Sequence, residues 1–179
     1  MKLSWSNGIV TCNRVQKISY TGDKFNSSLN WDWSVDAETG YLWCYGYSAS
    51  ATDRFGKKTF IKFALPELLT STQVTLTDSN AISSNDLTFN GLMQDTHIEN
   101  DIMFYLFGYN NANYLGGVLI IDLSTMSALS NGIISMVDTG YELEGITRVD
   151  NKLVVTTHTP NHNAYDMGIY EIDLLQSNT

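Results

Sequence analysis

Acidic side chains and one histidine lie in or just before short apolar segments that recur along the chain. If these segments are the innermost strands of a repeated β unit, their polar side chains could converge on a cation or a small ligand. The alternative is that they are solvated or cap loops. Asp32 and Asp95 share one repeat position, three residues before an apolar residue, which fits a structural role as well. The candidate ligand-binding residues are Asp32, Trp33, Asp95, His97, Glu142 and Glu144.

Motifs that would anchor a known reaction are absent from the sequence. It contains no G-x-S-x-G nucleophile elbow, no G-x-x-x-x-G-K-[ST] loop and no G-x-G-x-x-G fingerprint. We therefore expect no cofactor, assign no catalytic residue and favour a binding protein over an enzyme. The alternative is a carbohydrate-active hydrolase or lyase that uses Asp32, Asp95 or Glu144, since glycoside hydrolysis needs two carboxylates at a suitable separation.

His158 and His162 have a spacing that metal ligands can take, with Asp166 nearby. The surrounding stretch is rich in Thr, Pro and Asn, which is typical of a loop, and it offers neither cysteines nor a helix to hold the ligands. We therefore predict no metal site. Cys12 and Cys44 form no C-x-x-C pair, so we interpret them as small buried apolar residues, with a single disulfide as the alternative.

Five aromatic residues, Trp31, Trp33, Trp43, Tyr45 and Tyr47, lie within one short stretch of sequence. Flat rings with polar edges suit a sugar-binding surface. Residues at alternate positions of a strand share one face, so Trp43, Tyr45 and Tyr47 are expected to point the same way. We interpret that face as a buried core between neighbouring β units, with a sugar-binding surface as the alternative.

The charge balance restricts the partners. The chain has 179 residues, with 10 Lys or Arg against 19 Asp or Glu, and a net charge of −9. This argues against nucleic acid and anionic membrane surfaces. No run of about 18 apolar residues is present, so we expect no membrane insertion. The first residues lack the apolar region of a signal peptide, but a chain cut from a longer precursor would look the same, so an extracytoplasmic or cell-surface location stays open.

Strand-forming residues dominate, and no long helical stripe competes with them. The sequence predicts an all-β fold in a single domain over residues 1–179. The predicted strands are 8–19, 31–36, 41–48, 58–65, 73–78, 93–98, 102–109, 117–123, 132–137, 144–149, 152–158 and 167–174.

Three segments repeat one plan, in which an apolar residue precedes an acid, a tight turn follows and an apolar strand resumes. A further strand follows each hairpin and ends at a leucine. A fourth, weaker strand is expected at 73–77 and at 132–137. The hairpin segments are 35–43, 98–104 and 149–155, and the terminal leucines are Leu65, Leu123 and Leu174.

Antiparallel units at this spacing are typical of β-propeller blades. The sequence predicts about three four-stranded blades, whereas rings close with about 4–8. We favour a fragment that lacks N-terminal blades of a larger propeller; the alternative is a homodimer that forms one six-bladed ring. Segment 8–15 could supply a missing outer strand to another unit. Exposed blade faces would promote association in either case.

The segment Tyr141-Glu142-Leu143-Glu144-Gly145-Ile146, with Asp150-Asn151-Lys152-Leu153-Val154-Val155, resembles an inner-strand and hairpin pattern of six-bladed propellers. The pattern reads PEGI…NGKLYV and belongs to the TolB-like and NHL-like propellers of bacteria and phages. The resemblance covers roughly residues 31–174, departs at Leu143, where proline is usual, and implies architecture alone. We expect a non-enzymatic module that binds a protein or glycan partner across one face of the ring.

Overall fold

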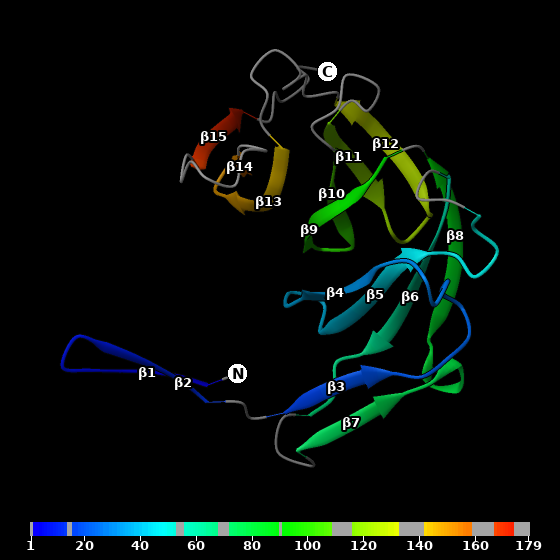
Figure 1. Cartoon of the computed structure of the whole chain (residues 1–179), viewed down its shortest axis with the longest axis horizontal. Helices are drawn as coiled ribbons and strands as arrows, with labels where there is room; N and C mark the ends of the chain where they lie inside the picture. The colour runs from blue at the N-terminus through cyan, green and yellow to red at the C-terminus, as the bar shows by residue number, and fades with distance from the viewer. Residues whose placement is uncertain are drawn as a thin grey trace.

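The computed structural model describes residues 2–13, 16–52, 56–67, 72–89, 91–108, 116–132, 142–158 and 167–173. Strands make up most of this part of the chain, which confirms the all-β prediction (Figure 1). The elements are β1 (Lys2–Ser6), β2 (Ile9–Asn13), β3 (Lys17–Tyr20), β4 (Trp31–Asp36), β5 (Tyr41–Tyr47), β6 (Gly56–Ala64), β7 (Gln73–Leu76), the short 3-10 helix η1 (Asp78–Asn80), β8 (Ser83–Phe89), β9 (Met93–Glu99), β10 (Ile102–Phe107), β11 (Gly117–Asp122), β12 (Ser127–Gly132), β13 (Glu142–Val149), β14 (Lys152–His158) and β15 (Met167–Asp173).

Three antiparallel sheets follow one another along the chain. Sheet 1 has the strand order β4-β5-β6-β8, sheet 2 has the order β9-β10-β11-β12, and sheet 3 has the order β13-β14-β15. The three predicted hairpins are confirmed, because they join the first two strands of each sheet. The described residues form two smaller sheets as well, the hairpin β1-β2 and the parallel pair β3-β7.

The residues of the turns explain why the hairpins could be predicted from the sequence. Between β9 and β10, Asn100 and Asp101 have φ values of 53° and 59°. This left-handed backbone conformation matches the twist of strands joined by a two-residue turn, and Asn and Asp adopt it more readily than most residues. After β4, Asp36 Oδ1 accepts hydrogen bonds from the N–H groups of Glu38 and Thr39. An aspartate that binds the backbone in this way builds the turn from its own side chain.

Sheet 2 packs face to face against sheet 1 on one side and sheet 3 on the other, with an apolar core at each contact. Trp43, Tyr45 and Phe60 of sheet 1 meet Met103 and Tyr105 of sheet 2. The alternate residues of β10 face the other way, so that Phe104 and Leu106 pack against Leu143, Ile146, Leu153 and Val155 of sheet 3. Strands β5 and β10 are therefore apolar on both faces because both faces are covered.

The first strands of the three sheets lie beside one another. Strand β9 contacts both β4 and β13 (Figure 1). The far face of sheet 1 is covered by β3 and β7, where Tyr20 and Leu76 pack against Cys44 and Phe63. Cys44 is a buried free thiol, so the interpretation of this cysteine as a small apolar residue is confirmed, whereas the side chain of Cys12 lies outside the described residues.

Three strand predictions are wrong. The fourth strand of sheet 1 is β8, not 73–78; the latter segment forms β7 and pairs with β3 in parallel. The predicted strand 8–19 is divided between β2 and β3, which belong to different sheets. The fourth strand of sheet 2 is β12, earlier than predicted, and residues 133–137 lie outside the described residues. These segments are polar or short, so local alternation did not reveal their partners.

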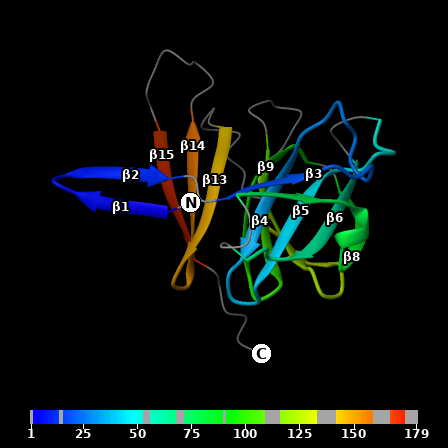
Figure 2. The same ribbon diagram turned by 90° about the horizontal axis from the view of Figure 1, so that it is seen from below.

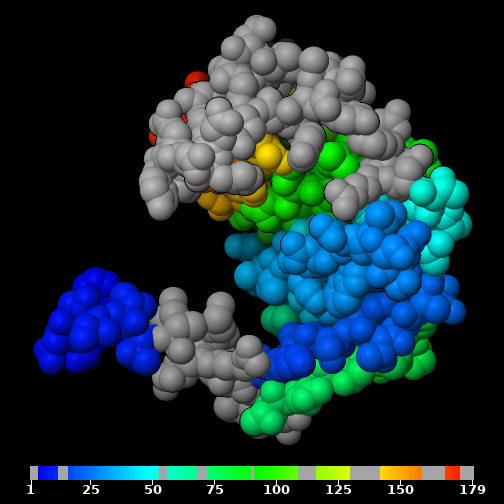
Figure 3. Space-filling view, in the orientation of Figure 1, coloured from blue at the N-terminus to red at the C-terminus, as the bar shows by residue number. Residues whose placement is uncertain are grey.

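The β1-β2 hairpin projects from the side of the molecule that carries β3 and β7 (Figures 1 and 2). In the space-filling view it stands apart from the described surface of the rest of the chain (Figure 3). Trp5 and Val10 are register partners, so they share one face of this hairpin, and both are exposed.

Candidate functional site

Two of the predicted ligand-binding residues join neighbouring sheets. Asp95 on β9 accepts a hydrogen bond of 2.9 Å from the N–H of Ile146 on β13. Glu142 at the start of β13 accepts one of 3.0 Å from the side-chain amide of Gln94 on β9. Both carboxylates therefore lie at the junction of sheets 2 and 3, where they hold the two first strands together.

His97 lies on β9 and Glu144 on β13. The His97 Nε2 atom lies 3.8 Å from Glu99 Oε2, and its ring is 6.2 Å from that of Phe104. Glu99 is shared, because the Arg148 guanidinium also donates to it at 3.0 Å. Glu144 is exposed on β13. Of these contacts, the one between Arg148 and Glu99 again connects β9 with β13.

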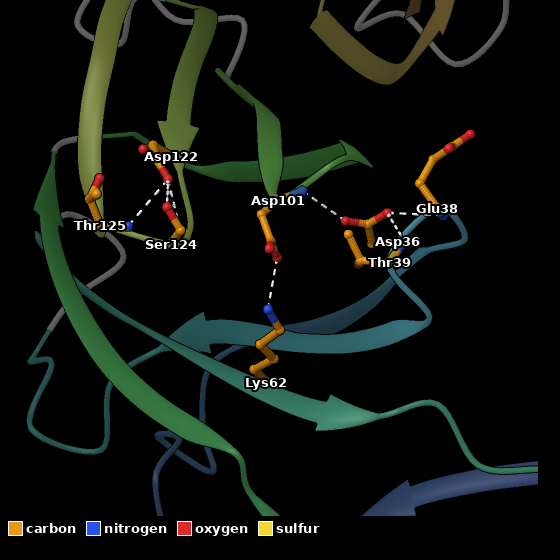
Figure 4. A network of polar contacts seen from close by, with 8 residues as sticks. All are labelled: Asp36, Glu38, Thr39, Lys62, Asp101, Asp122, Ser124 and Thr125. Carbon is orange, nitrogen blue, oxygen red and sulfur yellow. Dashed lines mark hydrogen bonds and ion pairs between the residues drawn. The ribbon is translucent and has the colours of Figure 1, made fainter.

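The turns between strands carry further carboxylates that join sheets (Figure 4). Asp36 is fully buried, and its second oxygen accepts the N–H of Asp101 at 2.8 Å, which links sheet 1 to sheet 2. The Lys62 ammonium donates to Asp101 at 2.9 Å and lies 3.7 Å from the centre of the Tyr41 ring. Burial raises the Asp36 pKa, but the hydrogen bonds from Asp101 and Thr39 outweigh it and hold the pKa below its ordinary value.

The turn after β11 repeats the chemistry of the turn after β4. Asp122 Oδ1 accepts the hydroxyl and the N–H of Ser124 and the N–H of Thr125 (Figure 4). These hydrogen bonds, led by the one from the Ser124 side chain, lower the Asp122 pKa below its ordinary value. Aspartates at both turns therefore accept hydrogen bonds from the backbone of their own turns.

No group of three or more His, Cys, Asp or Glu side chains suited to a metal ion occurs in the described part of the chain. His158 is described, whereas His162 and Asp166 lie outside the described residues. Within the same described ranges, no helix has the length and apolar character needed to cross a membrane.

The aromatic stretch of the sequence divides between a core and a surface. Trp43, Tyr45 and Tyr47 on β5 are buried, which confirms that their face belongs to a core between sheets. Trp31 and Trp33 on β4 lie elsewhere, with ring centroids 5.8 Å apart in an edge-to-face arrangement. Trp33 also contacts Phe63 at 6.1 Å, which fixes it against the core below.

Trp31 is the centre of a partly exposed aromatic group that we call the aromatic shelf. Its ring is stacked on Phe25, with centroids 5.9 Å apart and an interplanar angle of 7°. Tyr20 lies below, 6.1 Å from Trp31 and 5.4 Å from Phe25. Trp31 is 37% exposed, and its neighbour in sequence, Asp32, is exposed as well. The aromatic shelf consists of Tyr20, Phe25, Trp31 and Trp33.

Three elements position the aromatic shelf. Trp31 is the register partner of Gly46 on β5, where an added Cβ would lie 2.5 Å from the Trp31 Cβ. Only glycine therefore allows β4 to bring the indole so close. The segment that carries Phe25 is held by a bridge to Ser48 and by the Asn26 side-chain amide, which donates to Ala51 O at 2.8 Å.

The base of the aromatic shelf is fixed by a hydrogen bond from the Tyr20 hydroxyl to the Asp78 carboxylate, which also accepts the N–H of Asp23. Burial, followed by this bond, raises the Tyr20 pKa. Burial also raises the Asp78 pKa, but the bonds from Tyr20 and Asp23 outweigh it, so the pKa lies below its ordinary value. Tyr20 thus stays a neutral donor, and its ring has one fixed orientation under Trp31.

No protein-family model matches the chain, and no curated protein matches it. One matching solved structure is that of a protein from Clostridium novyi NT that is inferred to be a conserved lipoprotein. It is 9% identical, with a TM-score of 0.44, and the match covers 79% of this chain and 85% of that chain.

Proposed function

We propose that the chain is a non-enzymatic binding module built from β-propeller blades, and that its aromatic shelf binds a neutral glycan. The blade assignment draws support from the two four-stranded sheets and the three-stranded one, stacked in chain order. The contacts of β9 with β4 and β13 support it further, since innermost strands gather at the axis of a propeller. The resemblance to TolB-like and NHL-like propellers is part of the same proposal.

The observation that carries the glycan proposal is the exposed Trp31 ring, stacked on Phe25 and supported by Tyr20. A rigid indole buries the flat apolar face of a pyranose with little loss of conformational freedom. Polar groups near a ring then fix the hydroxyls of the sugar, and Asp32 is exposed at that position. The two tryptophans of β4 differ in their surroundings. Trp33 packs against Phe63, whereas Trp31 is 37% exposed and is therefore accessible to a ligand.

The negative charge of the chain favours neutral glycans over anionic ones. With a net charge of −9 and an exposed carboxylate at Asp32, the shelf disfavours sulfated or uronic-acid sugars. Asp95, a residue that the enzymatic alternative would use, accepts the N–H of Ile146 with one oxygen and so has a structural contact of its own.

Calorimetric titration of the full chain with cellohexaose, xylohexaose and chitohexaose tests this function. We expect at least one of these neutral sugars to bind, and Trp31→Ala to weaken that binding about tenfold or more, a loss of about 1.4 kcal/mol. Trp5→Ala is the matched control, because this second exposed tryptophan lies on the β1-β2 hairpin, outside the shelf. Flat titrations with all three sugars, as a protein partner on this surface would give, or equal losses in both variants would overturn the proposal.

A further inference from the structure

Strand β15 is the last strand of sheet 3, and within the described residues no strand pairs with its outer edge. Ile169 is 71% exposed there, and Tyr170, which points to the opposite face, is 37% exposed. Sheets 1 and 2 each have a fourth strand at the corresponding position. An edge with open backbone groups and apolar side chains is a template for a further strand.

The β1-β2 hairpin has the complementary properties. Trp5 is 73% exposed, and Val10 beside it and Ile9 on the other face are exposed as well. A two-stranded hairpin without a covered face is marginally stable by itself. The apolar face of Trp5 and Val10 therefore favours a partner surface that no other described part of this copy supplies.

We propose that the β1-β2 hairpin of one copy pairs with the β15 edge of a second copy. The sheets follow an arc from sheet 3 through sheets 2 and 1 to the pair β3-β7, and the β1-β2 hairpin lies beyond that pair, on the same open side of the arc as sheet 3 (Figure 1). Among the described residues the hairpin and β15 belong to separate sheets and are not paired with each other. In a dimer with twofold symmetry, the hairpin of each copy pairs with the β15 edge of the other. The same contact then forms twice, so that neither hairpin and neither edge is left without a partner. Successive residues of the added strand point to opposite faces, so Ile9 can lie beside Ile169 while Trp5 and Val10 cover Tyr170.

The dependence of dimer affinity on ionic strength distinguishes this apolar contact from an attraction between opposite charges, which added salt would weaken. Each copy carries a net charge of −9, so association brings like charges together. Added salt screens that repulsion, and the dimer becomes tighter as salt rises. This inference does not depend on the glycan proposal, since the aromatic shelf is not part of the contact.

Light scattering of the full chain over a range of concentrations tests the exchange. We expect the mass to approach twice 20.0 kDa and Ile169→Lys to raise the dissociation constant of the dimer about tenfold or more. The matched control is Val149→Lys, at a residue 53% exposed on the opposite edge strand of sheet 3. It should leave the mass unchanged, and Ile9→Glu combined with Ile169→Lys should restore part of the affinity.

A chain that stays monomeric at every concentration would overturn the proposal, as would a dimer that Ile169→Lys and Val149→Lys weaken equally. A third contradicting result concerns the hairpin itself. If Trp5→Lys leaves the dimer intact, the contact lies elsewhere.

Discussion

At the scale of single residues, Tyr45 and Tyr105 lie in one core, yet their hydroxyl groups have different surroundings. The Tyr45 hydroxyl accepts a hydrogen bond of 2.7 Å from the Thr96 hydroxyl. The Tyr105 hydroxyl is buried and has no hydrogen-bond partner among the described residues. A buried polar group without a partner lowers stability, whereas a paired one contributes modestly to it.

Two matched substitutions test this difference. We expect Tyr45→Phe to lower the free energy of unfolding by about 1 kcal/mol, because Thr96 then loses its acceptor. Tyr105→Phe should leave it unchanged or raise it by up to about 1 kcal/mol, since it removes only an unpaired hydroxyl. Urea unfolding of both variants measures the difference. A larger loss for Tyr105→Phe would contradict the assigned surroundings.

Asp36 makes the free energy of unfolding depend on pH in the acid range. Its folded-state pKa lies below the ordinary value of 3.8, so the unfolded chain binds the proton more readily. The contribution of Asp36 is therefore complete above about pH 5 and disappears as the pH falls through the lowered folded-state value. In Asp36→Asn, one amide N–H must face a backbone N–H, either of Asp101 or of the Glu38–Thr39 turn.

We expect Asp36→Asn to lower the free energy of unfolding by about 1–3 kcal/mol at pH 7 and by less at about pH 3. Denaturant unfolding at the two pH values measures this. Asp150→Asn, at an exposed turn residue, is the control and should stay within about 0.5 kcal/mol of wild type. An undiminished effect of Asp36→Asn at acid pH would count against the buried carboxylate.

At the scale of the elements, Gly46 sets the distance between β4 and β5. A methyl group there would lie 2.5 Å from the Trp31 Cβ and 2.7 Å from its Cα. Because backbone is involved, the strands must separate. We expect Gly46→Ala to lower the free energy of unfolding by about 1–3 kcal/mol and to weaken glycan binding as Trp31→Ala does. Unchanged stability by urea unfolding, together with unchanged sugar affinity, would show that Trp31 is not held by this contact.

The elements also show what sequence could and could not predict. The hairpins were predictable because Asn100, Asp101 and Asp36 supply turn chemistry that acts within a few residues. Strand β8 was missed because Ser83–Phe89 is largely polar, and it pairs with β6 across the intervening β7. The parallel pairing of β3 with β7 joins residues more than fifty positions apart, which no local periodicity reports.

The candidate site was predictable only in part. Trp31 and Trp33 were visible as aromatic residues at alternate positions, but Phe25 and Tyr20 come from a loop and from another sheet. Their approach depends on Ser48, Gly46 and Asp78, and no pattern in the sequence connects these residues. The convergence of Asp32, Asp95 and Glu144 on one ligand stays a prediction.

At the scale of the whole molecule, three stacked sheets share two cores, so that sheet 2 is covered on both faces and sheet 3 on one. On β14, Leu153, Val155 and Thr157 are buried, whereas Val154 and Thr156 between them are partly exposed. Among the described residues, the stack therefore ends at sheet 3 with a partly exposed face and an unpaired edge, and the proposed exchange uses that edge.

The central claim, that the aromatic shelf binds a neutral glycan, is tested most directly by the indole N–H resonances. The chain has 4 tryptophans, each with one such resonance, and substitution of each in turn assigns them. We predict that the neutral hexasaccharide found to bind shifts the Trp31 and Trp33 resonances of the nitrogen-15-labelled chain and leaves those of Trp5 and the buried Trp43 in place. Shifts confined to Trp5, or four unmoved resonances at saturating sugar, would contradict the claim.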